Sequence, residues 1–290
     1  MTKEIISQEK PKSKQESIGE LNFAMEALAD EAEARYGVRL LNSDGSANSE
    51  VFGSLSEEDV RFINNRINYW AGADSPDARA TFAKFHNLGD PEQLDEEELK
   101  KTMVDYWHKN TQTGNGAIFE MMVTVIFRKA LGEDYLVMRS SKRDDYQNGV
   151  DNIIINTKTN EVICAFDEVQ EPTLVGKRLG NKNIKIIDIA VKGGQSIKDG
   201  VKFINGNVEK ASYNNLPVFY ISSDPDQLKK DLQKINAKDI NNATDFEHEL
   251  FVKFASTIIQ QAEMLLQLES VPQKVKDRLK KVSAFFNDRK

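Results

Sequence analysis

Two acidic side chains and a glutamine near the middle of the chain have the types and spacing of a metal-binding site. Asp151 lies near the start of one strand-like run, GVDNIII, and Glu168 and Gln170 lie near the end of the next, ICAFDEVQ. Side chains alternate between the two faces of a strand, so Glu168 and Gln170 share one face and Asp167 points to the other. Asp167 would replace Glu168 only if the register slipped by one residue.

A polar turn is expected to bring these side chains together. The strand-like runs 150–155 and 161–169 flank Asn156-Thr157-Lys158-Thr159-Asn160, a composition typical of a hairpin turn. In an antiparallel hairpin, the start of the first strand lies beside the end of the second. The sequence therefore predicts that Asp151 lies next to Glu168 and Gln170.

A pair of adjacent carboxylates indicates a cation. Two neighbouring carboxylates raise each other's pKa unless a positive charge lies between them. Mg²⁺ prefers oxygen ligands and takes one or two protein carboxylates together with substrate phosphate. We therefore expect a Mg²⁺ site, with Mn²⁺ as the alternative, at which the metal lowers the pKa of a bound water for attack on a phosphodiester. Gln170 can orient a water by hydrogen bonds but brings no positive charge.

These motifs resemble the PD-(D/E)xK nuclease superfamily over residues 111–222. Asp151 matches the family's first-strand aspartate, Glu168-Val169-Gln170 matches the (D/E)xK element, and Glu120 offers the acidic residue that the family often carries on its first helix. The resemblance implies an α/β fold with a restriction-endonuclease-like αβββαβ core. It also implies a metal-dependent nuclease, with DNA as the expected substrate. Asp151, Glu168 and Glu120 would bind the metal, and these three with Gln170 would form the catalytic set.

The chain departs from the family pattern in three places. Gln170 replaces the usual lysine, no proline precedes Asp151, and the segment after Gln170 is predicted as loop and hairpin where the family has its second helix. The missing ammonium group could come from that segment, and the sequence does not choose among Lys177, Lys182, Lys185 and Lys192.

Charge is distributed unevenly along the chain. The net charge is −7, and residues 1–110 hold 13 Lys and Arg against 22 Asp and Glu, whereas residues 171–211 hold eight basic side chains against four acidic ones. Attraction to phosphates depends on nearby charge, so a locally basic surface can bind nucleic acid on an acidic protein. A solvated loop is the alternative interpretation. The side chains predicted to hold the phosphate backbone are Lys177, Arg178, Lys182, Lys185 and Lys192.

The periodicity of apolar residues divides the chain into four regions. Residues 1–16 are polar and predicted to be disordered, 17–110 form a helical region, 111–225 form the nuclease-like core, and 226–290 form helices that pack on the core. Within the core we expect a helix over 117–131, strands over 135–138 and 216–221, and a second hairpin at Asn205-Gly206. Thr244 with Glu247 predicts a capping box at the start of a C-terminal helix.

Several function classes are excluded, and one competitor remains. No apolar run approaches the roughly 20 residues that span a bilayer, and the N-terminal segment does not resemble a signal peptide, so we expect a cytoplasmic protein without a membrane partner. The single cysteine, Cys164, excludes an internal disulfide. The competing interpretation is a non-catalytic nuclease-like protein that binds nucleic acid or proteins. Its helical ends would recruit a protein partner or a second copy of the chain.

Overall fold

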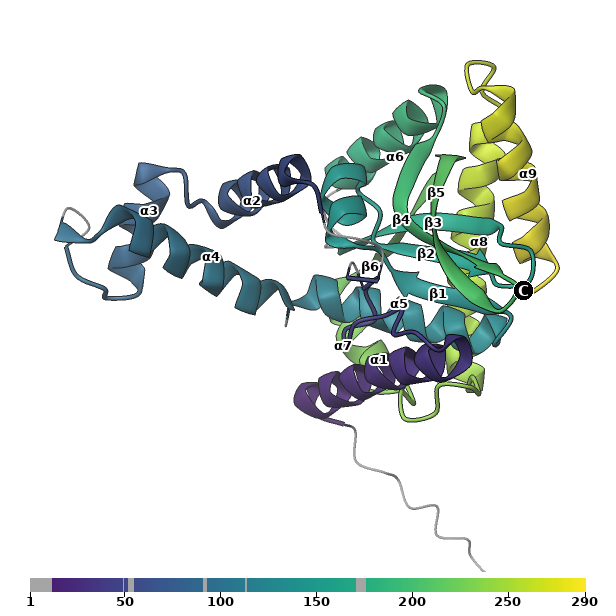
Figure 1. Ribbon diagram of the computed structural model, residues 1–290, viewed down its shortest axis with the longest axis horizontal. Coiled ribbons are helices and arrows are strands. Elements are labelled where there is room, and N and C mark those ends of the chain that lie inside the picture. Colours follow the sequence, from purple (N-terminus) through teal and green to yellow (C-terminus); the bar gives the residue numbers. More distant parts are fainter. Residues whose placement is uncertain (1–11, 49, 52–54, 91–92, 113, 171–175) are drawn as a thin grey trace, which may run out of the picture.

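The structure is a computed structural model that describes residues 12–48, 50–51, 55–90, 93–112, 114–170 and 176–290. The side chains of residues 112, 169–170 and 176–183 lie outside this description. The described part is a mixed α/β protein (Figure 1). A body built around a small sheet carries a projecting arm of helices, and α1 (Lys14–Tyr36) lies along one side of the body.

The central sheet has four strands in the order β1-β2-β3-β6. The first three are antiparallel neighbours, and β6 runs parallel to β3. Parallel neighbours need a crossover connection, which here contains α6 and the separate two-stranded hairpin β4–β5. The bounds are β1 (Tyr135–Arg139), β2 (Asn152–Asn156), β3 (Val162–Gln170), α6 (Gly176–Val191), β4 (Gln195–Ile204), β5 (Asn207–Leu216) and β6 (Val218–Ser223).

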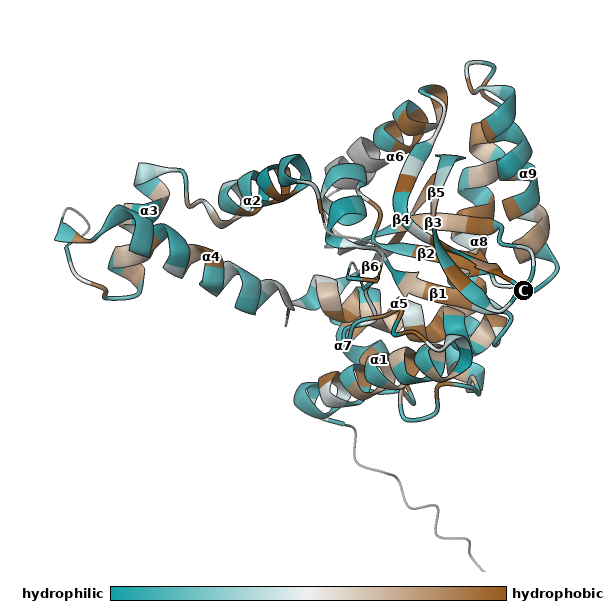
Figure 2. Cartoon of the chain, in the orientation of Figure 1, coloured by the Kyte–Doolittle hydropathy of each residue, from teal (hydrophilic) through white to brown (hydrophobic). Residues whose placement is uncertain are grey.

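Helix α5 (Asn115–Leu131) is the centre of the core. It is apolar around most of its circumference, as expected for a helix enclosed by other elements. It packs against β1 and β3 on one side and against α1 and α8 on others. Figure 2 shows hydrophobic residues concentrated in the central sheet and α5, whereas much of the hairpin β4–β5 is hydrophilic. The remaining helices of the body are α7 (Pro225–Leu232), α8 (Asp245–Leu266) and α9 (Gln273–Asn287).

The arm consists of α2 (Glu57–Ala71), α3 (Pro76–Phe85) and α4 (Glu96–Gln112), which extend away from the body (Figure 1). Its own small core contains Ala73, Ala83, Leu99 and Met103. The arm also contacts the body through Asp59 at the start of α2. Its carboxylate pairs with Arg143 and accepts a hydrogen bond of 3.0 Å from Gln147 Nε2.

The expected α/β class, strands and hairpins are confirmed. The strands predicted over 135–138, 150–155, 161–169 and 216–221 correspond to β1, β2, β3 and β6 within two residues at each end. The hairpin at Asn205-Gly206 joins β4 to β5, and Thr244 with Glu247 forms the capping box of α8. Helices also occupy the regions flanking the core, as predicted.

Two predictions of local structure were wrong. The segment after Gln170 is not only loop and hairpin, because α6 occupies 176–191. Ile186 and Ala190 lie one turn apart and are buried, and α6 packs on β6, so this helix depends on a tertiary partner. The predicted disordered N-terminus is too long, since α1 begins at Lys14 with a capping box between Ser13 and Glu16. Residues 1–11 of that segment lie outside the described residues.

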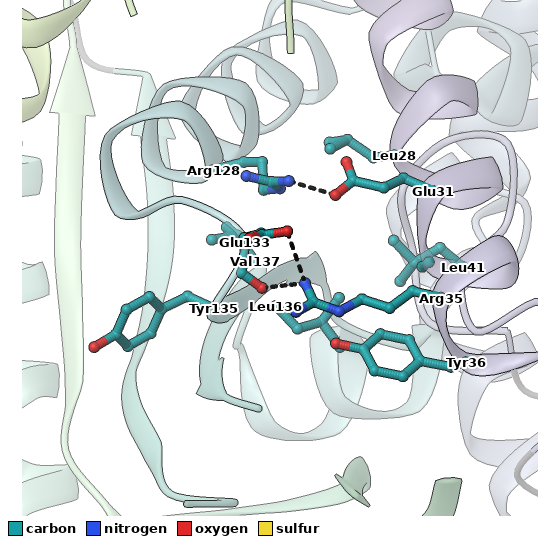
Figure 3. A pocket seen from close by; sticks show the side chains of 11 residues that line it. Leu28, Glu31, Arg35, Tyr36, Leu41, Arg128, Glu133, Tyr135, Leu136 and Val137 are labelled. Atoms are coloured by element: carbon teal, nitrogen blue, oxygen red, sulfur yellow. Dashed lines mark hydrogen bonds and ion pairs between the residues drawn. The ribbon is translucent and has the colours of Figure 1, made fainter. Parts of the chain in front are cut away.

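A small cavity marks the junction of α1 with α5 and β1 (Figure 3). Its volume is about 30 Å³. Arg128 of α5 pairs with Glu31 of α1, and Arg35 of α1 lies 3.8 Å from the Glu133 carboxylate. These ion pairs connect α1 to the body, and neither Asp151 nor Glu168 lines this cavity, so it belongs to the scaffold.

A fully buried ion pair connects α5 to α8. Lys129 Nζ lies 2.8 Å from Glu247 Oε1, and both side chains have 0% exposure. Lys129 also donates to the Asn236 carbonyl at 2.8 Å, while Glu247 Oε2 accepts from the Thr244 amide at 2.8 Å. The capping-box glutamate therefore neutralises a buried lysine as well as capping α8.

Removing one partner of this pair should strongly destabilise the fold. Lys129→Met leaves the Glu247 charge buried and unpaired, and we expect it to lower the free energy of unfolding by about 3–5 kcal/mol. Adding Glu247→Gln, which keeps the cap, should recover a large part of that loss. Urea denaturation of the wild type, both single variants and the double variant measures this. A double variant as unstable as Lys129→Met alone would contradict it.

Candidate functional site

The β2–β3 hairpin places Asp151 against Glu168, as predicted. The Asp151 amide donates to the Phe166 carbonyl at 3.0 Å, and the Glu168 amide donates to Asp151 Oδ2 at 2.8 Å. Strand alternation puts Asn152 and Glu168 on one face of the sheet and Asp167 on the other. Asp151 lies at the entry of β2, where its carboxylate continues the hydrogen bonding beyond the last strand pair.

Glu168 is held by a chain of hydrogen bonds that reaches α5. Its Oε1 accepts from Asn152 Nδ2 at 2.6 Å, and Asn152 Oδ1 accepts from the Thr124 hydroxyl at 2.9 Å. Thr124 lies one helical turn after Glu120, so both face the sheet. Glu168 Oε2 is buried and has no hydrogen-bond partner among the described residues. An unsatisfied buried carboxylate oxygen is costly, so it marks a position where a ligand would be favourable.

Glu120 is paired with an arginine at the end of β1. Arg139 Nη2 contacts Glu120 Oε2, and Arg139 Nη1 donates to the Asp44 carbonyl at 3.0 Å. Burial acts to lower the pKa of Arg139, but the charges of Glu120 and Asp44 outweigh it and raise that pKa. Glu120 is therefore neither a solvated surface residue nor an unpaired carboxylate.

Asp145 is a member of the site that sequence reasoning missed. It lies in the single π-helical turn η2 (Asp144–Asn148) between β1 and β2, a kind of distortion often found at functional sites. Its neighbour Asp144 accepts from the backbone amides of Lys198 and Asp199 at 3.0 and 2.9 Å and thereby holds the turn. Asp145 is hydrogen-bonded to Asp151, and burial together with the Glu120 charge raises its pKa to about 7. The sequence signal that could have identified Asp145 is the pair of adjacent aspartates, Asp144 and Asp145, shortly before Gly149.

The carboxylates of the site repel one another. Burial and then the charge of Glu120 raise the pKa values of both Asp151 and Glu168 well above their usual range. A cation between the carboxylates would relieve this repulsion. Across the described residues, however, no three His, Cys, Asp or Glu side chains are arranged so that they could hold a metal ion. The predicted metal ligands Asp151, Glu168 and Glu120 therefore stay a prediction.

Asp167 lies on the face of β3 opposite Glu168, where Lys185 of α6 contacts it. Asp167 is buried, and its Oδ2 lies 3.7 Å from Lys185 Nζ of α6. Lys185 also lies over the Tyr220 ring, 5.8 Å from its centroid. A Cβ on Gly149, whose φ is +60°, would lie 2.9 Å from Lys185 Nζ, so a side chain there would displace the ammonium group. Lys185 thus reaches the entry of the hairpin from α6.

Of the other predicted basic residues, Lys192 is the one whose side chain is described. It follows the last residue of α6 and pairs with Asp188 at 2.7 Å. The side chains of Gln170, Lys177, Arg178 and Lys182 lie outside the described residues. Gln170 itself pairs with Ser223 in the sheet. The basic phosphate-binding surface therefore stays a prediction.

A cavity of about 720 Å³ opens beside the carboxylates, between the body and the arm. The body contributes the charged groups of Asp44, Glu120, Arg139, Lys142 and Asp145 to its lining. Trp70 of α2 and Trp107 of α4 line it from the arm. Two members of the cluster, Glu120 and Asp145, are thus accessible to a molecule of ligand size.

No known family model, characterised protein or solved structure compared with this chain matches it. Within the described residues, no helix combines the length and apolar character needed to cross a membrane. The chemistry of the site must therefore be argued from its own residues.

The raised pKa of Asp145 makes stability depend on pH. Because the folded state holds the proton more tightly than the unfolded chain, this group stabilises the fold below the ordinary aspartate pKa, near 4, and that contribution is lost as pH rises through about 7. Asp145→Asn imitates the protonated form. We expect its melting temperature to exceed that of the wild type by a margin that grows between pH 4 and pH 7 and then levels off. Thermal melts across this range test it, and a margin independent of pH would contradict it.

Proposed function

We propose that this protein is a divalent-cation-dependent nuclease that hydrolyses phosphodiester bonds. The observation that carries the proposal is the buried Oε2 of Glu168, which has no hydrogen-bond partner among the described residues and lies in a cluster with Glu120, Asp145 and Asp151. Buried groups with strongly shifted pKa values, lying beside an open cavity, are typical of catalytic sites.

The order of the elements supports this proposal. Along the chain, α5, β1, β2, β3, α6 and β6 follow the αβββαβ order that the PD-(D/E)xK resemblance implies, with the hairpin β4–β5 inserted before the last strand. Asp151 lies at the entry of the second strand and Glu168 near the end of the third. Both are the residues that the resemblance assigns to metal binding.

The donor set fits a hard cation in its chemistry, because every candidate ligand is a carboxylate oxygen. Asp151 and Glu168 would hold Mg²⁺ or Mn²⁺, with Glu120 as the third ligand. When bound, such a cation lowers the pKa of a water molecule and offsets charge on the phosphoryl group. In hydrolysis the water oxygen bonds to phosphorus, the bond from phosphorus to one sugar oxygen breaks, and that oxygen takes up a proton.

Arg139 links the metal site to substrate binding in this proposal. It is paired with Glu120 and lies 3.8 Å from the Asp44 carboxylate, so a further anionic partner would help Arg139 release Glu120 toward a cation. A substrate phosphate is such a partner, since guanidinium groups bind phosphate oxygens in a bidentate manner. Arg139 would then hold the phosphate at the edge of the carboxylate cluster.

Lys185 approaches the Asp151 end of the hairpin, beside Gly149, from the face that carries Asp167, and there it is the candidate for the ammonium group that Gln170 cannot supply. Among Lys185 and Lys192, whose side chains are described, Lys185 is the one within 4 Å of a carboxylate of the β2–β3 hairpin. It reaches the hairpin from the helix that follows β3.

Removing either proposed metal ligand should abolish cleavage. We expect degradation of linear, circular or single-stranded DNA, or of RNA, in Mg²⁺ or Mn²⁺. Asp151→Asn and Glu168→Gln should each reduce it by at least about 100-fold, since a bound cation contributes several kcal/mol to transition-state stabilisation. The cations should also raise the melting temperature of the wild type and not that of Glu168→Gln.

Glu161→Gln is the matched control, because Glu161 lies at the opposite end of the same hairpin and pairs with Lys281. It should keep full activity. Activity that is equal in the wild type and in both ligand variants would refute the proposed site. Stabilisation by cations without cleavage of any substrate would instead favour a nuclease-like protein that has lost catalysis.

Lys185 of α6 and Lys192, which follows the end of that helix, give a second test. Lys185→Met should lower kcat at least about tenfold, as expected for loss of a group that assists proton transfer. Lys192→Met should change kcat less than twofold because Lys192 pairs with Asp188. Steady-state cleavage kinetics measure both, and equal effects of the two substitutions would exclude a specific role for Lys185.

A further inference from the structure

Both tryptophans of the chain line the cavity beside the carboxylates. Trp70 comes from α2 and Trp107 from α4, and their rings are stacked with centroids 6.0 Å apart and an interplanar angle of 24°. Tyr146 of η2 meets Trp70 edge-on, with centroids 5.1 Å apart. Three aromatic rings from three separate elements therefore meet on one wall.

These rings are not the core of the arm. That core consists of Ala73, Ala83, Leu99 and Met103, whereas Trp70 keeps 42% of its surface exposed. Packing of α2 against α4 explains part of the Trp70–Trp107 contact. It does not explain why the exposed aromatic surface is turned to the same cavity as the carboxylates.

The polar groups of the cavity complement a nucleotide. Arg139 and Lys142 offer positive charge, and the Asn110, Thr111 and Ser140 side chains offer hydrogen-bonding groups. The volume of about 720 Å³ lies within the range of small-ligand sites. Glu120 and Asp145 border the same space, so a phosphate bound at Arg139 would lie next to the acidic cluster.

We propose that this cavity receives an unpaired nucleotide of a single-stranded nucleic acid, whose base stacks on the aromatic wall formed by Trp70, Trp107 and Tyr146. The inference rests on the proposed nuclease function only for the phosphate position next to the carboxylates. Stacking on aromatic side chains binds any base and requires that its face be free, a condition that single strands meet. Paired bases inside a duplex are covered by their neighbours.

The charge of the arm also favours a single strand. Residues 57–112 hold 7 Lys and Arg against 12 Asp and Glu, and the first turn of α4 is Glu96, Glu97 and Glu98. A duplex lying along such a surface would lose the phosphate contacts that dominate duplex binding. A nucleotide inserted into the cavity gains stacking energy that does not depend on the outer surface.

Tryptophan fluorescence reports on this site directly, because both tryptophans lie in it. The full chain is titrated in EDTA, which prevents metal-dependent cleavage, with a 12-nucleotide single strand of DNA, the same strand of RNA, and a blunt duplex of equal length. We expect saturable quenching by at least one of the single strands and binding of the duplex at least about tenfold weaker. The stronger of the two single strands identifies the sugar.

Variants connect the quenching to the aromatic wall. Trp107→Leu should weaken single-strand binding at least about fivefold by anisotropy of a labelled strand, whereas Trp107→Phe should keep most of the affinity. Tyr69→Leu is the control, since Tyr69 is 73% exposed beside Trp70 on α2 and does not line the cavity. Thermal melts confirm that each variant is folded.

Three outcomes would overturn the inference: no binding of either single strand, duplex binding as tight as single-strand binding, or equal loss in Trp107→Leu and Tyr69→Leu. These outcomes are separable from the nuclease proposal. Metal-dependent cleavage without tryptophan-dependent binding would support the nuclease proposal and refute the stacking site. Tryptophan-dependent binding in EDTA without cleavage in Mg²⁺ or Mn²⁺ would support the stacking site and refute the nuclease proposal.

Discussion

The hydrogen bond from the Glu168 amide to the Asp151 carboxylate joins the entry of β2 to the end of β3, and the acidic cluster depends on it. A shift of one residue between these strands would exchange the faces of Glu168 and Asp167. The register is not uniform along the hairpin, because a bulge lies between Ile154 and Ile155. The pairing that matters for the site is therefore set at the end of the hairpin away from its turn, where Asp151 contacts β3.

Two buried glutamates of this fold, Glu247 and Glu168, differ in how far their carboxylate oxygens are hydrogen-bonded. Glu247 has a lysine partner and hydrogen bonds at both carboxylate oxygens, and it connects α5 with α8. Glu168 has Asn152 at one oxygen and no partner among the described residues at the other. Buried polar groups in proteins are normally hydrogen-bonded, and Glu247 follows this rule. Glu168 departs from this rule, and it belongs to a cluster of which Glu120 and Asp145 line an open cavity, as is typical of functional sites.

The arm completes the site that the body begins. The sheet and α5 supply the carboxylates and Arg139, whereas α2 and α4 supply the aromatic wall. Contacts of Asp59 with Arg143 and Gln147 join the arm to the region of η2, which carries both Asp145 and Tyr146. The proposed cleavage and the proposed base stacking thus share one cavity and depend on the same connection between arm and body.

Local rules determined much of this protein from the sequence alone. Strand alternation, the 156–160 turn and the capping boxes predicted β2, β3, the start of α8 and the closeness of Asp151 to Glu168, because each depends on residues near one another along the chain. Tertiary packing decided the rest. The helix α6 depends on β6, the hydrogen bonds of Asn152 depend on α5, and the roles of Asp145 and Arg139 depend on the meeting of η2, β1 and α5. The two tryptophans share a cavity only because α2 packs against α4 and contacts the body at η2, a long-range arrangement that no local pattern of apolar residues encodes.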